Sequence, residues 1–222
     1  MVKLRNQIAR TLLPGMSVPK PLGLLFSWIE SNGLFTDTKD GRRVGFLFPE
    51  DELRAGWTEM ERPGGTSIEF FAEGNINLKY WFGHAKPDVL NRLCVFARTG
   101  ADGSMAAFWL DSDGRQKIVH LGSGSGSTLV CVLADDPVDF LRLLAIGYDE
   151  ICWSEVFSRP PNADHSSGRM FVHPNVNYQN WVRDTFSVTI PQTAVEIVRC
   201  PSKMRDRHSD DPFCRWVRQN TQ

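Results

Sequence analysis

The stretch LCVFARTGADGSMAAFWLDSDGRQKIVHLGSGSGSTLVCVLADDPVDFLRLLAIGY, residues 93–148, decides the fold of this chain. It begins with the apolar run Leu93–Ala97, which has the length of a buried strand and precedes the turn residues 99–103. Two further apolar segments, Met105–Leu110 and Lys117–Leu121, flank Asp111-Ser112-Asp113-Gly114. In that tetrapeptide the aspartates can bond nearby backbone and the glycine tolerates positive φ. The pattern predicts a strand that ends near residue 98, followed by a β-hairpin.

The second half of the stretch predicts one more strand and a helix that covers the sheet. After the connection Gly122–Ser127, the run Thr128–Leu133 is apolar, β-branched and about the length of a buried strand. Asp136 is suited to cap a helix, and Pro137 to occupy its first position, where the missing N–H costs nothing. Helical spacing and a glycine stop then follow at Phe140, Leu143, Leu144 and Gly147.

Flanking segments predict further helices and a β-meander. Helices are expected at 1–12, 22–33, from about 176, and from 212 onward, and the second of them follows a linker at Val18–Pro21. Strands are expected at 41–48, 57–60, 66–72 and 76–82, the last two joined about Gly74-Asn75. Residues 159–168 contain breakers and predict a polar surface loop.

The quoted stretch resembles the SUKH superfamily of Smi/Knr-like proteins. Members of that family typically show a strand, a Gly-Asp-Gly-type turn, hairpin strands and a helix of the form Ala-Asp-Asp-hydrophobic-x-x-Phe-Leu. The corresponding segments here are Val95–Ser104, Asp111–Gly114, Ile118–Gly122 and Val132–Ala145, and Leu24–Gly33 is similar to the family's early helix ending in Asn-Gly. The resemblance covers about residues 19–153. It implies an α+β, SUKH-like fold: a mainly antiparallel central β-sheet flanked by helices, with a C-terminal elaboration.

Length and composition favour one globular domain. The chain has 222 residues, of which 41% are hydrophobic and 23% charged. We predict a single SUKH-like domain over residues 1–222, with a core at about 19–153 and a C-terminal extension, 154–222, packed on that core. A net charge of −1 leaves no global basic footprint for nucleic acid. Five widely spaced cysteines without a C-x-x-C pair favour a reducing cytoplasm, and no apolar run is long enough for a membrane span.

Several motifs that resemble functional sites are better explained by structure. Gly122-x-Gly124-x-Gly126 precedes a strand and lacks Gly-Lys-Ser/Thr, so it predicts a connector, not a phosphate loop. The tetrapeptide at 111–114 begins like a calcium loop, but Gly122 stands where the closing glutamate is required. The carboxylate pairs Asp135-Asp136 and Asp210-Asp211 each precede a proline that opens a helix, which predicts caps.

The sequence assigns no residue to a catalytic, cofactor-binding or metal site. His165 and His173 share a loop with Asp164, but no His pair at helical spacing and no Cys cluster accompanies them, so we expect no metal. Free Cys152 is expected to pack in the core and not to act as a nucleophile. We therefore expect no cofactor. The partner-binding residues and the oligomeric state are not predictable from the sequence.

The resemblance implies a non-enzymatic protein-binding domain. Many relatives look like bacterial immunity proteins that bind and occlude a cognate toxin domain, and others act as regulatory scaffolds. Such a role needs a stable sheet and buried anchors. Aromatic residues on the predicted strands are expected to lie mostly in the core, with some exposed as partner anchors: Trp57, Tyr80, Trp81 and Trp109.

Two other classes of function stay open. One is a hydrolase or transferase whose site assembles from dispersed residues such as Cys152, His120 and Asp135. The other is a nucleic-acid accessory module that uses the C-terminal basic cluster Lys203, Arg205, Arg207, Arg215 and Arg218. Acidic neighbours dilute that cluster, so we expect a solvated face there and no nucleic-acid partner.

Overall fold

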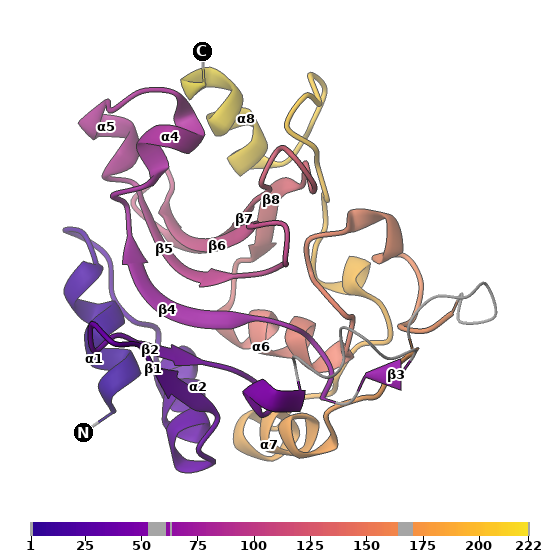
Figure 1. Ribbon diagram of the computed structural model, residues 1–222. Coiled ribbons are helices and arrows are strands. Elements are labelled where there is room, and N and C mark those ends of the chain that lie inside the picture. Colours follow the sequence, from indigo (N-terminus) through magenta and orange to yellow (C-terminus); the bar gives the residue numbers. More distant parts are fainter. Residues whose placement is uncertain (1, 53–60, 63, 164–170, 222) are drawn as a thin grey trace.

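The computed structural model describes residues 2–52, 61–62, 64–163 and 171–221 (Figure 1). Its centre is a seven-stranded sheet made of β1 (Phe35–Asp37), β2 (Arg43–Gly45), β4 (Glu69–Gly74), β5 (Leu93–Arg98), β6 (Met105–Leu110), β7 (Gln116–Leu121) and β8 (Val130–Ala134). The strand order is β1-β2-β4-β5-β6-β7-β8, and every neighbouring pair is antiparallel. Two short strands, β3 (Glu61–Arg62) and β9 (Phe171–Val172), form a separate parallel pair.

Helices cover both faces of the sheet. The larger apolar cluster packs one face against α1 (Lys3–Thr11), α2 (Lys20–Ser31), α6 (Pro137–Ile146) and α7 (Val176–Phe186). The smaller cluster packs the other face against α4 (Leu78–Phe82), α5 (Pro87–Leu90) and α8 (Pro212–Asn220). Figure 1 shows the curved sheet running between these two groups. Two short 3₁₀ helices are η1 (Ser154–Val156) and η3 (Ala194–Glu196). The predicted α+β class, with a mainly antiparallel sheet flanked by helices, is confirmed.

Burial on both faces explains why the central strands are continuous apolar runs. Along β5, Cys94 and Phe96 enter the larger cluster, whereas Leu93 and Val95 enter the smaller one. Alternate side chains of a strand point to opposite faces, so a strand covered on both sides needs apolar residues at every position. The run from Leu93 to Ala97 meets that requirement and lies in the middle of the sheet.

The predictions for residues 93–148 agree closely with the structure. The three strands β5, β6 and β7 lie where the apolar segments predict them, and β8 begins at Val130, two positions after the predicted start. Helix α6 begins at Pro137, and the Asp136 carboxylate caps it by accepting the backbone N–H of Val138 at 2.8 Å. Gly147, with φ 95°, ends the helix in the left-handed conformation that glycine adopts most easily.

The predicted strand at 76–82 is wrong, because residues 78–82 form helix α4. A strand would place alternate residues of this segment on one face. Instead, Leu78 and Phe82, four residues apart, are buried, whereas Ile76 and Tyr80 are 70% and 75% exposed. That is the spacing of one helical face. The predicted hairpin about Gly74-Asn75 is therefore wrong as well, and β4 pairs with β5 after α4 and α5.

Four other predictions need correction or cannot be fully examined. The predicted strand at 41–48 shortens to Arg43–Gly45, which pairs with the unpredicted strand β1. Helix α2 starts inside the predicted linker, because Pro21 lies in the first helical turn, where its missing N–H does no harm. The strand predicted at 57–60 and part of the loop predicted at 159–168 lie outside the described residues.

The C-terminal third contacts both layers of helices and the sheet edge. On α7, the Tyr178 hydroxyl donates a hydrogen bond to the Leu141 carbonyl of α6 at 3.2 Å. Before α8, the carboxylate of Asp211 accepts the backbone N–H of Cys214 at 2.8 Å and that of Val132 on β8 at 2.9 Å. One side chain thus both caps α8 and fixes that helix to the edge strand.

Candidate functional site

Three segments meet at one end of the sheet, and we call their meeting point the loop junction: residues 99–104, 122–128 and 148–155. The Asp102 carboxylate joins the first two segments by accepting the N–H and the hydroxyl of Ser104, each at 2.9 Å, the hydroxyl of Ser123 at 2.8 Å, and the N–H of Ser127 at 2.6 Å. Partial burial raises the pKa of Asp102, but these hydrogen bonds outweigh it and lower the pKa overall. The junction is therefore organised around an ionised carboxylate.

Glu150 fastens the third segment to the first. Its Oε1 accepts the backbone N–H of Ala101 at 2.6 Å, and its Oε2 accepts the indole N–H of Trp153 at 2.7 Å. The Cys152 thiol donates to the same Oε2 at 3.4 Å, and the Ser127 hydroxyl donates to the Cys152 carbonyl at 2.5 Å. The indole of Trp153 is thus held from its nitrogen edge, while the residue stays 39% exposed.

Two glycines are required for this close approach. A Cβ atom at Gly100 would lie 2.6 Å from Cys152 Sγ, and one at Gly126 would lie 2.7 Å from Asp102 Oδ2. The connection Gly122–Ser127 thus lies against the Asp102 carboxylate, which accepts the backbone N–H of Ser127. A loop arranged in this way is a structural connector, because a phosphate placed beside Asp102 would be repelled.

His120 is fully buried at the edge of the junction and is held at both ring nitrogens. Its Nδ1 lies 2.9 Å from the Leu129 carbonyl, and its Nε2 lies 2.9 Å from the Thr99 hydroxyl. Because a carbonyl only accepts, Nδ1 carries the proton and donates, and Nε2 of the neutral ring accepts from Thr99. Burial lowers the pKa of His120 to about 4, so the ring is uncharged at neutral pH.

The dispersed residues considered for a hydrolase do not form a catalytic group. Burial and the charges of Glu150 and Asp102 raise the pKa of the Cys152 thiol far above neutrality, so it stays protonated and weakly nucleophilic. Asp135 lies at the opposite end of β7 and β8, where it forms an ion pair with Lys117 at 2.6 Å. Cys152 and His120 both border the junction, but their hydrogen bonds go to other partners.

A cavity of about 570 Å³ lies beside the loop junction, and we call it the Trp153 recess. This volume falls within the range of about 300–1,000 Å³ that is typical of ligand pockets. The described residues that line it are Gly147, Tyr148, Asp149, Glu150, Trp153, Glu155, Val156, Arg159, Pro160, Pro161, Asn162, Ala163 and Val172. The lining therefore combines aromatic and aliphatic surface with three carboxylates and one guanidinium.

The three carboxylates of the recess differ in their partners. Asp149 pairs with the buried guanidinium of Arg62 at 2.5 Å, although burial raises the pKa of Asp149 overall. Glu155 pairs with Lys203 at 2.5 Å, and this bond lowers the pKa of Glu155. Within the described parts of the chain, Glu150 accepts hydrogen bonds only from uncharged donors. Of the three carboxylates, Glu150 therefore has the negative charge that neighbouring side chains compensate least.

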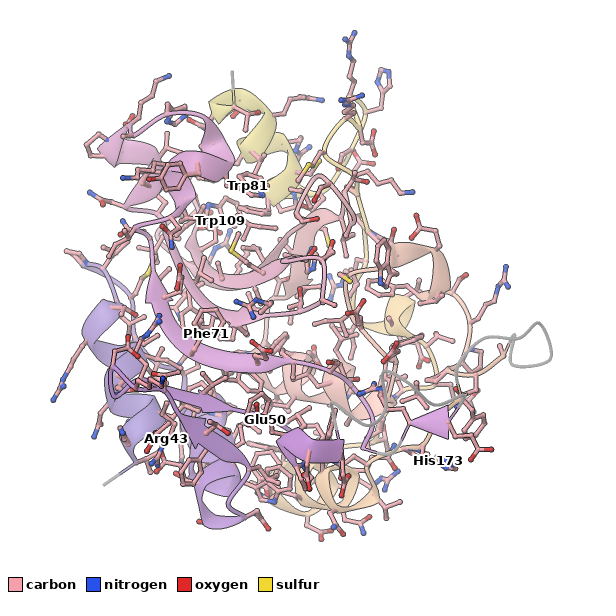
Figure 2. All side chains as sticks on the ribbon, in the orientation of Figure 1. Arg43, Glu50, Phe71, Trp81, Trp109 and His173 are labelled. Atoms are coloured by element: carbon pink, nitrogen blue, oxygen red, sulfur yellow. The ribbon has the colours of Figure 1, made fainter. Side chains whose placement is uncertain are left out.

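The predicted aromatic anchors differ in their exposure and in the elements that carry them. Tyr80 is exposed but lies on helix α4, not on a strand. Trp81 donates its indole N–H to the Gly122 carbonyl at 2.7 Å, and Trp109 is buried against Phe213. Figure 2 shows Trp81 and Trp109 near the end of the molecule that carries α8. Trp57 lies outside the described residues.

The remaining predicted sites are dispersed. His173 lies far from Trp81 (Figure 2), and its ring pairs with Glu61 at 3.2 Å; His165 and Asp164 lie outside the described residues. Within the described ranges, no group of three or more His, Cys, Asp or Glu side chains is placed to hold a metal ion. Of the C-terminal basic cluster, Lys203 is engaged by Glu155, and Arg218 donates to the Arg207 carbonyl.

Sequence reasoning missed the Trp153 recess. Trp153 lies at the boundary that the family resemblance reaches, and its neighbours belong to a segment read only as a polar loop. The available signal was the presence of the apolar residues Ile151, Trp153 and Val156 beside the acidic residues Asp149, Glu150 and Glu155, a mixture that is not typical of a solvated loop. Composition alone does not show that this segment folds back on the junction.

The fold and the site define an α+β protein whose helix-covered antiparallel sheet carries a recess beside a hydrogen-bonded loop junction. Comparison of the chain with protein-family models, curated proteins and solved structures gives no match. The SUKH resemblance therefore stays a prediction. In the described part of the chain, no helix combines the length and the apolar character that crossing a membrane requires. All five cysteines are free thiols.

Proposed function

We propose that this chain is a non-enzymatic protein-binding domain, and specifically a cytoplasmic immunity protein of SUKH type that neutralises a cognate bacterial toxin by occluding it. The observation that carries the proposal is the partly exposed Trp153, which Glu150 holds in the lining of the recess. Tryptophan is enriched among the residues that contribute most to protein–protein affinity. An indole fixed before binding loses little conformational entropy on association.

The junction also supports binding over catalysis. The thiol of Cys152 is protonated and the ring of His120 is neutral and fully hydrogen-bonded, so neither is prepared for proton transfer or nucleophilic attack. The immunity role, with the toxin as partner, is what the SUKH resemblance of about residues 19–153 implies. The free thiols support a reducing compartment.

The test is capture of the partner from the native host with a tagged chain, followed by identification and calorimetric titration of any toxin domain. We expect a stoichiometric complex that abolishes the toxin's activity. Trp153→Ala should weaken it at least tenfold, which corresponds to about 1.4 kcal/mol. The matched control is Val195→Ala, since Val195 is 42% exposed on η3 and Trp153 is 39% exposed.

The outcomes separate the alternatives. A complex that forms without affecting toxicity would favour the regulatory scaffold. Binding that falls steeply with salt and requires nucleic acid would favour a nucleic-acid accessory module that uses the C-terminal basic cluster. Rapid alkylation of Cys152 at neutral pH would contradict the protonated thiol and revive the hydrolase alternative.

A further inference from the structure

The described residues that line the Trp153 recess include more acidic than basic side chains. Among its described lining residues, Asp149, Glu150 and Glu155 are acidic and Arg159 alone is basic. Arg62 and Lys203 compensate Asp149 and Glu155 from outside the recess. Glu150 is held by one backbone N–H, one indole N–H and one thiol. The Arg62 guanidinium acts on Glu150 through its charge alone and donates to other groups, so the Glu150 carboxylate can still accept a charge-assisted hydrogen bond from an incoming cation.

The rest of the lining is suited to the body of a long side chain. Tyr148, Val156, Pro160 and Val172 supply apolar walls, and the Trp153 indole stands next to the Glu150 carboxylate at 2.7 Å. A guanidinium suits both the indole and the carboxylate, because its plane can stack on an aromatic ring while its edge donates to a carboxylate. An ammonium is a compact, strongly hydrated point charge and uses this combination less well.

We propose that the recess receives an arginine side chain projecting from the protein partner, with its guanidinium stacked on the Trp153 indole, its edge toward the Glu150 carboxylate, and its aliphatic stem along the apolar walls. This inference rests on the proposed protein-binding function and names the chemistry of the partner's anchor. The volume of about 570 Å³ leaves room for the residues that flank the arginine. The occupant is therefore a short arginine-bearing segment.

The probe for this site is the peptide acetyl-Ala-Arg-Ala-amide, compared with the same peptide carrying citrulline. Citrulline has the shape of arginine without its charge. Binding is followed at the indole N–H signal of Trp153 in ¹H–¹⁵N spectra, assigned by its loss in Trp153→Phe. We expect saturable shifts with a dissociation constant of about 1 mM, and at least tenfold weaker binding of the citrulline peptide.

Two carboxylate variants test the charge. Glu150→Gln should weaken binding of the arginine peptide at least fivefold. If this variant disturbs the other indole signals, Glu155→Gln replaces it, because the Glu155 side chain is exposed and its loss should weaken binding two- to threefold. Asp88→Asn, an exposed carboxylate on α5, is the matched control and should change nothing.

Equal binding of the arginine and citrulline peptides, or no shift of the Trp153 signal with either, overturns the inference. The failure of the proposed function looks different. If a toxin partner is captured but Trp153→Leu and the carboxylate variants leave its affinity unchanged, the function stands and the arginine site falls. If the arginine peptide binds as expected and no protein partner is retained, the site stands and the immunity role falls.

Discussion

The carboxylate of Asp102 accepts the backbone N–H of Ser127 at 2.6 Å, across 25 positions of sequence. This bond joins the turn between β5 and β6 to the connection between β7 and β8. Through Ser127 and Glu150 the same network reaches the segment that carries Trp153. The shape of the Trp153 recess thus depends on a partly buried polar network and not on one loop alone.

Asp102→Ala should lower the free energy of unfolding by about 2 kcal/mol, because it leaves the N–H groups of Ser104 and Ser127 without their acceptor. Asp113→Ala is the matched control, since Asp113 also precedes a glycine in a turn but, among the described residues, accepts only from the exposed side chain of Arg115. Its effect should stay within about 0.5 kcal/mol. Denaturant unfolding measures both values, and equal effects would contradict the role given to Asp102.

Gly126→Ala should be destabilising through the same network. The added Cβ would lie 2.7 Å from Asp102 Oδ2, so the carboxylate must move. In a double-mutant cycle with Asp102→Ala, the two effects should therefore be non-additive by about 1 kcal/mol. Strict additivity would show that Gly126 is required for a reason unrelated to Asp102. Unfolding of the two single variants and the double variant in urea provides the measurement.

His120 should make the protein less stable in mild acid. Its pKa is about 4 in the folded chain and 6.5 as an ordinary histidine, so between these values the unfolded chain binds the proton and the folded chain does not. Stability is complete above pH 6.5 and declines as the pH falls toward 4, by about 3 kcal/mol from this group.

Unfolding free energies measured from pH 7 to pH 4 test this behaviour. His120→Gln should flatten the pH dependence, although it lowers stability at pH 7 by disturbing the bonds to Thr99 and Leu129. His208→Gln removes an exposed ring and serves as the matched control. If His120→Gln keeps the same slope as the unchanged protein, other groups cause the acid sensitivity.

The two Asp-Pro helix caps should differ in their contribution to stability. Asp136→Ala removes one exposed capping bond and should cost about 1 kcal/mol. Asp211 is 2% exposed and also accepts the N–H of Val132 on the edge strand, so Asp211→Ala should cost about 3 kcal/mol. Thermal and denaturant unfolding of the two variants compares them, and equal losses would contradict the double role of Asp211.

The candidate site was less predictable than the fold. On the sequence alone, Cys152 and His120 are candidates for a site assembled from dispersed residues, but their ionisation depends on burial and on Glu150 and Asp102, which sequence spacing does not encode. Trp153 and Glu150 are separated by only three positions, yet nothing in that spacing indicates a cavity. The cavity exists because distant segments pack around them.

Helix α4 shows the same limit within the fold. Its five residues are too few for local propensity to decide between helix and strand, and the choice follows from the sheet surface that buries Leu78 and Phe82. By contrast, α6 carries its own cap, proline and glycine stop, and it forms where these signals lie.

The sequence by itself determined the strands β5 to β8, helix α6 and the other helices with clear apolar stripes, because period, caps and turns are local properties of the chain. Only the tertiary structure decided which carboxylates meet which donors. Asp136 and Asp211 carry the same local signal, yet one caps a helix in solvent and the other is buried against β8. Long-range packing determines burial, and burial determines the energy of a polar group.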